Sequence, residues 1–263
     1  MMNFLQSKKK YKTGIVLSGG ASRGFAHLGV LQALNEADIY PDVISGVSAG
    51  AIVGAFYADG KKPIDIVKLF QGKRFKEMAS FNLRRNGLLN ISGLRKFMKE
   101  NLESKNLEDL KIPMVVSATN MRTGKSAYFD KGDIIDIVMA SSSIPVLFQI
   151  ARVNGEVYMD GGIVDNLPVE PIKDKCRKII AVHVNPIGEE TDINGLVKIA
   201  FRSFHLSVAA GVSLKKDDID LFIEPLELKD YGLLDLSKAK EMFDIGYDYT
   251  KKIINENKHV IPA

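Results

Sequence analysis

Short apolar runs with the length of buried strands alternate along this chain with longer stretches whose apolar residues recur at helical spacing. The strand-like runs are residues 13–19, 42–47, 112–120, 156–161, 178–186 and 220–225. The helix-like stretches are residues 25–37, 49–60, 195–214 and 237–257. Such alternation is typical of a mostly parallel sheet with helices on both faces. The sequence therefore predicts an α/β fold, with its functional site at the edge where the strands end.

The composition fits one globular domain in a reducing compartment. A chain of 263 residues is long for one domain but within the range of single α/β domains. Apolar residues make up 46%, which is enough for a sizeable core. The lone cysteine, Cys176, excludes an internal disulfide. The net charge of +4 is too small to indicate a nucleic-acid partner, although it suits attraction to an anionic membrane surface.

The ends of the sequence are expected to be short tails around one domain. We expect residues 1–12 and 258–263 to be tails and residues 13–257 to form the domain. The first residues offer no apolar stretch suited to a signal peptide. The longest mainly apolar run, residues 46–58, is shorter than the roughly 20 residues that span a bilayer. We therefore expect a cytoplasmic protein, free or peripheral at the membrane, and the oligomeric state stays open.

A serine lies between two glycines in "GVSAG", where a predicted strand gives way to a predicted helix. A turn this sharp presses the residues two before and two after the serine together, which favours glycine at Gly46 and Gly50. Ser48 then projects from the tip of the turn, beside the free amides of the helix. The pattern indicates a nucleophile, and a plain strand–helix connection built from small residues is the alternative.

A second glycine-rich turn, "GGASRG", follows the first predicted strand. A dinucleotide-binding loop requires glycine where Ala21 stands, and an acidic residue where Ser48 ends the next strand. A phosphate-binding loop requires a Lys-Ser/Thr pair where Phe25 and Ala26 stand. The remaining interpretations are an oxyanion hole formed by the backbone amides of Gly19, Gly20 and Ala21, or a purely structural turn.

The base that would activate the serine is less evident from the sequence. The histidines fit a catalytic role poorly: they stand in predicted helices (His27, His205), inside a strand (His183) and in the C-terminal tail (His259). Asp160 offers another base, because "YMDGG" would deliver it from a strand with two glycines beside it. A surface Asp-Gly turn is the alternative interpretation of that motif.

Four motifs taken together resemble the patatin-like phospholipase family. They are "GGASRG" (19–24), "GVSAG" (46–50), "ASSSIPVLF" (140–148) and "YMDGG" (158–162), in that order. The stretch "YGLLDLSKAKEMFDIGY" (231–247) is similar to the tail of small bacterial members. The likeness covers residues 13–247. Each motif alone is weakly specific, whereas the ordered set is specific.

The resemblance implies a three-layer α/β/α sandwich with a mostly parallel central sheet, and a serine lipid acyl hydrolase that uses a Ser-Asp dyad, an acyl-enzyme and no cofactor or metal. The matching motifs make Ser48 the nucleophile and Asp160 the base, with Gly161 and Gly162 completing the acid motif. The oxyanion loop is then formed by residues of the first glycine-rich turn, namely Gly19, Gly20, Ala21, Arg23 and Gly24. The sequence departs from the family at Ala21, where a third glycine is usual.

Two further functions stay open on the sequence alone. One is an α/β-hydrolase esterase with a Ser-His-Asp triad, and the other is a lipid-sensing protein of the same fold without turnover. The partner in each case is a lipid or another acyl ester, with transient contact to a membrane surface. Calcium independence is expected of the dyad enzyme.

Residues 73–99 form a basic stretch in which eight basic side chains and one acidic residue, Glu77, alternate with apolar ones. This stretch predicts either a basic cap that docks on anionic lipid or an ordinary solvated face over a small apolar cluster. The serines at 141–143 are expected to begin the loop beneath the site rather than to react.

Overall fold

The computed structural model describes residues 9–73, 75–81, 89–190, 193–212 and 217–257. Within them an eight-stranded sheet has the order β10-β9-β1-β2-β5-β8-β7, and β6 also pairs with β5. Its strands are β1 (Tyr11–Leu17), β2 (Val43–Val47), β5 (Met114–Asn120), β6 (Lys125–Phe129), β7 (Ala151–Val153), β8 (Glu156–Asp160), β9 (Cys176–Val182) and β10 (Leu221–Ile223). A separate two-stranded ribbon pairs β3 (Ser80–Phe81) with β4 (Leu89–Asn90).

Most of the sheet is parallel, as the sequence predicts. Strands β10, β9, β1, β2 and β5 run in one direction, whereas β6 and β8 pair antiparallel with β5 and β7 pairs antiparallel with β8. The antiparallel addition is short, because β8 pairs with only the last three residues of β5. It therefore extends the sheet beyond the carboxyl ends of the parallel strands.

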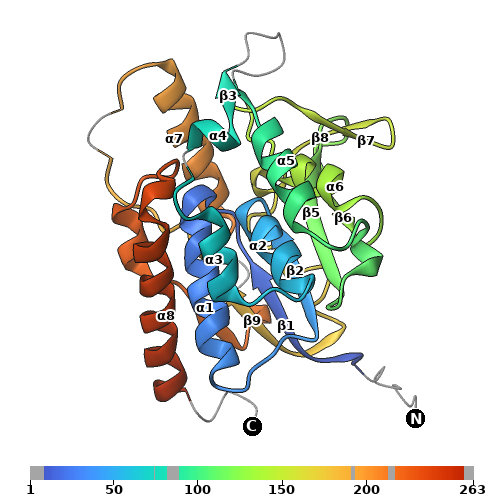
Figure 1. Cartoon of the computed structure of the whole chain (residues 1–263), viewed down its shortest axis with the longest axis vertical. Helices are drawn as coiled ribbons and strands as arrows, with labels where there is room; N and C mark the ends of the chain where they lie inside the picture. Colours follow the sequence, from blue (N-terminus) through green and yellow to red (C-terminus); the bar gives the residue numbers. More distant parts are fainter. Residues whose placement is uncertain (1–8, 74, 82–88, 191–192, 213–216, 258–263) are drawn as a thin grey trace.

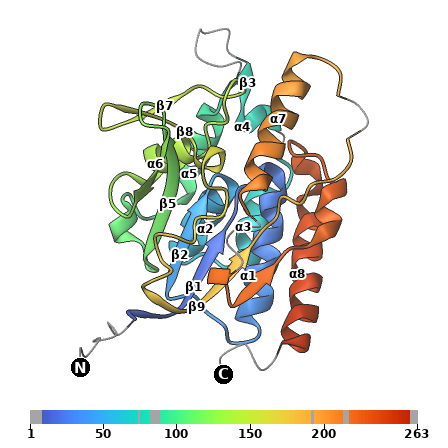
Figure 2. The same ribbon diagram turned by 180° about the vertical axis from the view of Figure 1, so that it is seen from behind.

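Helices cover the two faces of the sheet unequally. Helices α1 (Phe25–Asn35), α2 (Ala49–Ala58), α3 (Pro63–Phe70) and α8 (Ala239–Glu256) lie on one face (Figures 1 and 2). The other face is covered by the turns of residues 161–175 and the end of α7 (Leu196–Ala210), where Leu167, Ile172 and Val212 pack on Val16 and Val43. The fold is thus an α/β sandwich of three layers, with one thin outer layer.

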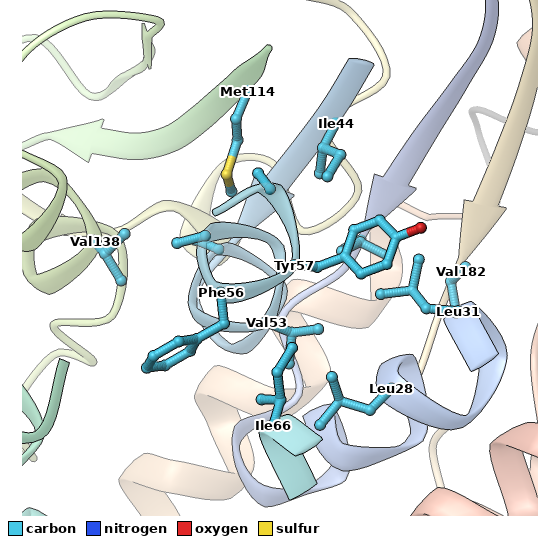
Figure 3. Close-up of a cluster of buried hydrophobic side chains, with 14 of the residues drawn as sticks. Leu28, Leu31, Ile44, Val53, Phe56, Tyr57, Ile66, Met114, Val138 and Val182 are labelled. Carbon is cyan, nitrogen blue, oxygen red and sulfur yellow. The ribbon is translucent and has the colours of Figure 1, made fainter. Parts of the chain in front are cut away.

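The main core surrounds α2. Ile15 and Leu17 of β1 point into it, while Val16 between them points to the opposite face, as strand alternation requires. Side chains from several elements meet there (Figure 3), among them Leu28, Leu31, Ile44, Phe56, Ile66, Met114 and Val138. Because α2 is buried on almost every side, its many small residues let the neighbouring elements approach closely.

The six predicted strands and four predicted helices are confirmed, with ends that shift by a few residues. Helices α3, α5 (Ser92–Asn101) and α6 (Ile134–Ser141) were not predicted. The β-branched residues of α6 favour a strand by propensity. The helix begins nevertheless because the Asp133 side chain accepts a hydrogen bond from the Asp136 amide at 2.8 Å.

Part of the basic stretch 73–99 is described. It folds as α4 (Phe75–Met78), the β3–β4 ribbon and α5, while residues 74 and 82–88, with Arg84 and Arg85, lie outside the described residues. Of the expected tails, residues 1–8 and 258–263, with His259, lie outside them too, whereas Tyr11 and Lys12 of the expected tail 1–12 already belong to β1. No helix in the described part of the chain combines the length and apolar character needed to cross a membrane.

Candidate active site

Ser48 lies at the tip of a strained turn between β2 and α2. Its φ of 52° and ψ of −120° are uncommon for a residue with a side chain. The turn is tight enough that a Cβ on Gly46 would come within 2.8 Å of the Gly50 carbonyl oxygen, and one on Gly50 would overlap the Leu17 carbonyl oxygen. The Ser48 side chain makes no capping hydrogen bond to α2. Its hydroxyl is therefore not used to begin the helix.

Strand register brings Asp160 and the glycine loop to the level of Ser48. Val47 pairs with Ser117 of β5, and the next residue of β5, Ala118, pairs with Asp160. Ser48, which follows Val47, is therefore level with Asp160. On the other side Leu17 pairs with Gly46, so Gly19 is also level with Ser48. Strand β8 delivers Asp160 by running antiparallel to β5, a direction that the sequence did not predict.

The Asp160 carboxyl is buried, with 1% of the residue exposed. Burial raises its pKa to about 6, while the nearby Ser48 hydroxyl and the Gly162 amide act in the opposite direction. The Gly162 amide donates to Oδ1 at 2.8 Å. Among the described residues, Oδ2 has no hydrogen-bond partner of standard geometry. The carboxylate thus faces Ser48 with one oxygen held and the other available to take a proton.

The glycine loop packs directly against the serine. A Cβ on Gly19 would lie 3.3 Å from the Ser48 Cβ and 2.5 Å from Asn166 Oδ1, so only glycine fits there. Ala21 has a φ of 50°, in the left-handed region. Within the described part of the chain, the amides of Gly19, Gly20 and Ala21 donate to no other residue. They are the donors that an oxyanion beside Ser48 would require.

Arg23 holds this loop from behind rather than adding a donor to it. Its buried guanidinium donates to the carbonyl oxygens of Tyr231 at 3.0 Å, Pro186 at 2.9 Å and Lys229 at 3.1 Å, and to Asn185 Oδ1 at 3.2 Å. We therefore describe Arg23 as a positioning residue.

Neighbouring residues complete this attachment. Ser22 donates from its amide to the Leu233 carbonyl oxygen and from its hydroxyl to that of Gly232. Gly24 allows the loop to lie on α2, because a Cβ there would come within 2.8 Å of the Ala49 Cβ. The late segment 229–233 thus anchors the loop by several bonds.

Two polar residues near the serine were not singled out as site residues. Ser141 accepts a hydrogen bond from the Ser48 amide at 2.8 Å and donates to the Ser117 carbonyl oxygen at 2.6 Å. It fixes the turn from below, in line with the expectation that the serines at 141–143 lie beneath the site. Asn166 lines the small cavity that contains Ser48 and Asp160. The sequence around Asn166 did not indicate this placement.

The described histidines have other partners than the serine. His27 Nε2 lies 2.8 Å from the Ser18 carbonyl oxygen, and burial lowers its pKa to about 4. His183 Nδ1 lies 2.8 Å from Glu224 Oε1. His205 lines the same small cavity as Ser48 and Asp160, and burial, followed by repulsion from Arg23, lowers its pKa to about 4. Asp160 is thus the group whose pKa suits a base at neutral pH.

An apolar cavity of about 130 Å³ opens above Ser48. An empty apolar cavity of about 150 Å³ is large enough for benzene, so this one suits part of an alkyl chain. Its walls come from α1, α2, α3, the ribbon region and the loop after α6, and include Phe25, Leu28, Val53, Phe70, Met78, Ile144 and Phe148. Met78, Ile91 and Leu94 place the described part of the basic stretch on this cavity. In the described part of the chain no cluster of His, Cys, Asp and Glu has the arrangement of a metal site.

Comparisons with known proteins agree with this geometry. A model of the patatin-like phospholipase family matches residues 15–173. Lysophospholipase NTE1 of Saccharomyces cerevisiae is 28% identical over 90% of this chain, and the protein from Aspergillus fumigatus is 27% identical over 93%. The chain spans only 16% and 18% of those two relatives.

A solved structure supports the fold. The crystal structure of VipD from Legionella pneumophila matches with a TM-score of 0.55 and 18% identity, over 94% of this chain and 67% of that one. At that identity the likeness concerns the fold alone. Together with the family match, it shows that the chain belongs to the patatin-like phospholipase family, a family of carboxylic ester hydrolases.

Proposed function

We propose that this chain is a lipid acyl hydrolase of the lysophospholipase type, which cleaves the carboxylic ester of a single-chain lipid through Ser48 and Asp160. The observation that carries the proposal is the buried Asp160 carboxyl, level with Ser48 and with a pKa raised to about 6. At neutral pH such a group is ionised and is also a far stronger base than an ordinary aspartate. The relatives named lysophospholipase support the substrate class.

The first half of the reaction forms an acyl-enzyme. Asp160 takes the proton of the Ser48 hydroxyl as Oγ bonds to the ester carbonyl carbon. The carbonyl electrons move to oxygen, and the amides of Gly19, Gly20 and Ala21 stabilise that negative charge. The intermediate collapses with cleavage of the bond to the alcohol, which leaves with the proton held by Asp160.

The second half restores the enzyme. Water gives a proton to Asp160 and bonds to the acyl carbon, the ester bond to Ser48 breaks, and Ser48 regains its proton as the fatty acid leaves. The apolar cavity above Ser48 accepts the acyl chain, and the same lack of water around Asp160 keeps its pKa high. A cytoplasmic location, transient contact with a membrane surface and calcium independence stay predictions.

The test compares Ser48→Ala and Asp160→Asn with the wild type on a lysophospholipid. Each substitution is expected to lower kcat by on the order of 10⁴-fold or more, and a fluorophosphonate probe should label the wild type but not Ser48→Ala. The wild-type rate should fall as the pH drops through about 6, because protonation removes the base. Full activity in Asp160→Asn, together with loss in His205→Ala, would favour a histidine triad instead. A folded wild type that neither labels nor turns over would favour a lipid-sensing protein.

A stability measurement checks the cause of the raised pKa independently of activity. Asp160 has a folded pKa near 6 and an ordinary value of 3.8, so the folded protein loses stability as the pH rises between these values. Asp160→Asn should therefore be more stable than the wild type at pH 7, by up to about 3 kcal/mol, with no gain below pH of about 4. Urea unfolding at both pH values measures the difference, and an equal effect at both would contradict the explanation by burial.

A further inference from the structure

A second, polar cavity of about 890 Å³ lies beside the site and has no part in the mechanism above. Its walls come from the loop after β9, from α7 and from the late segment that holds the oxyanion loop. The charged residues that line it are Arg23, Lys198, Arg202, Lys229, Glu189, Glu190, Asp230 and Asp235.

This polar cavity adjoins the small cavity that contains Ser48 and Asp160. His205 and Leu233 line both the polar cavity and the small cavity that contains Ser48 and Asp160. Leu233 and Leu234 also line the apolar cavity. The three spaces therefore meet at Leu233, with the serine and the acid between an apolar compartment and a polar one. A substrate of matching shape has its ester between an alkyl chain and a charged group.

Positive charge gathers where the polar cavity meets the reactive centre. Repulsion from Arg202 adds to burial in lowering the pKa of Arg23 to about 10. The pKa of His205 is lowered by burial first, and then by both Arg23 and Arg202. Because Arg23 donates to four oxygen acceptors of the chain, Arg202 is the guanidinium that can serve a ligand. An anion beside Arg202 would relieve this repulsion.

Arg202 is also held in place. Its Nη2 donates to the Gly188 carbonyl oxygen at 2.8 Å, which fixes one corner of a planar group with five N–H donors. A guanidinium held in this way binds phosphate with two parallel hydrogen bonds, whereas a carboxylic ester without charge gains nothing from it. Glu189 and Asp230 lie in the same cavity and suit a positively charged amine.

We propose that the polar cavity binds the phosphate-bearing head group of a single-chain phospholipid, with Arg202 as the ligand of the phosphate. The proposal rests on the proposed function, because the head group is placed relative to the ester at Ser48. It implies that the enzyme distinguishes lysophospholipids from neutral monoacylglycerols by their phosphate.

The kinetic test uses palmitoyl lysophosphatidylcholine and monopalmitoylglycerol, which share an acyl chain and differ in the phosphate. Arg202→Ala is expected to raise KM for the lysophospholipid about tenfold, equivalent to about 1.4 kcal/mol, and this loss should exceed any loss on monopalmitoylglycerol by the same factor. Arg177→Ala is the matched control, since Arg177 is exposed at the start of β9, at the opposite end of the sheet. Equal losses on both substrates, or equal wild-type KM values, would overturn the proposal.

A binding test separates this proposal from the proposed function. Calorimetry with Ser48→Ala measures glycerophosphocholine binding without turnover, and adding Arg202→Ala should weaken it about tenfold. If the wild type hydrolyses neither ester but this Arg202-dependent binding is present, the head-group site stands and the hydrolase assignment fails. Inorganic phosphate should bind more weakly than glycerophosphocholine. Equal binding of the two would identify a free-anion site and overturn the head-group assignment. Glycerophosphocholine binding that Arg202→Ala leaves unchanged would overturn it as well.

Discussion

The turn that carries Ser48 and the loop that carries Ala21 both hold a residue with a side chain at positive φ, but they are stabilised differently. The Ser48 turn depends on the glycines that flank it in sequence, Gly46 and Gly50, and on one distant hydrogen bond, from the Ser48 amide to Ser141. The Ala21 loop is held by Arg23 and Ser22, whose partners near residues 229–233 lie more than 200 positions along the chain. The sequence pattern of the Ser48 turn is thus local, whereas the loop of the proposed oxyanion donors is held by several distant contacts.

The largest effect is expected from a single added methyl group in the Ser48 turn. In Gly50→Ala the new Cβ would overlap the Leu17 carbonyl oxygen and lie 2.7 Å from that of Ser18, and backbone atoms cannot rotate away. We expect a loss of about 3 kcal/mol in the free energy of unfolding and a loss of fluorophosphonate labelling. Gly211→Ala is the control, since its Cβ would meet no atom of the described residues within 4 Å. Wild-type stability in Gly50→Ala would show that the turn is not locally constrained.

A smaller effect, on kcat rather than on KM, is expected from a change at Arg23, which holds the loop that carries Ala21. Arg23→Met keeps the apolar stem but removes the bonds to the late segment, so the amides of Gly19 to Ala21 lose their fixed direction. We expect kcat to fall about 10²-fold, with little change in KM and with the rate still falling through pH of about 6, because Asp160 is untouched.

Two variants distinguish this positioning role from a general need for charge. Arg23→Lys should not restore kcat, since one ammonium group cannot reach the separate acceptors of a planar guanidinium. Arg177→Met controls for the loss of an arginine elsewhere. A pH profile that shifts in Arg23→Met, or a kcat restored by lysine, would assign Arg23 an electrostatic role instead.

The smallest effect concerns Ala21 itself. A side chain in the left-handed region costs roughly 1–2 kcal/mol, so Ala21→Gly should be equally or slightly more stable than the wild type and keep kcat within about threefold, because glycine supplies the same amide. Ala21→Val places a β-branched residue at a φ of 50° and should lower both stability and kcat. Steady-state kinetics and thermal unfolding measure the pair. A large gain in activity from Ala21→Gly would mean that the alanine distorts the wild-type loop.

These differences also explain what could be predicted from the sequence. The strand–helix alternation identified the α/β fold, and the spacing of Gly46, Ser48 and Gly50 identified the turn, because both patterns lie within short stretches. The strand pattern alone could not predict that Asp160 lies level with Ser48, because this depends on the register of β8 on β5; only the family resemblance paired the two residues. The catalytic roles of these residues stay predictions until the variants are measured.

Other contacts of the site could not be predicted because the residues that form them are distant in sequence. Ser141 meets the Ser48 amide across 93 positions, and Arg23 meets the Tyr231 carbonyl across 208. Neither contact leaves a periodic pattern in one sequence. Helix α6 is different. Asp133 is an N-cap residue that indicates a helix start, but the β-branched residues after it favour a strand, so the helix was not predicted.

The bonds from Ser22 and Arg23 to residues 229–233 set an order of events during synthesis. A growing polypeptide on the ribosome contains Ser48 and Asp160 before residues 229–233 emerge, so the amides proposed to bind the oxyanion are not yet held in place. The nascent chain is therefore expected not to hydrolyse nearby lipids until residues 229–233 have emerged and bound the loop. Ribosome-stalled chains that end before residue 229 should remain unlabelled by a serine-reactive probe.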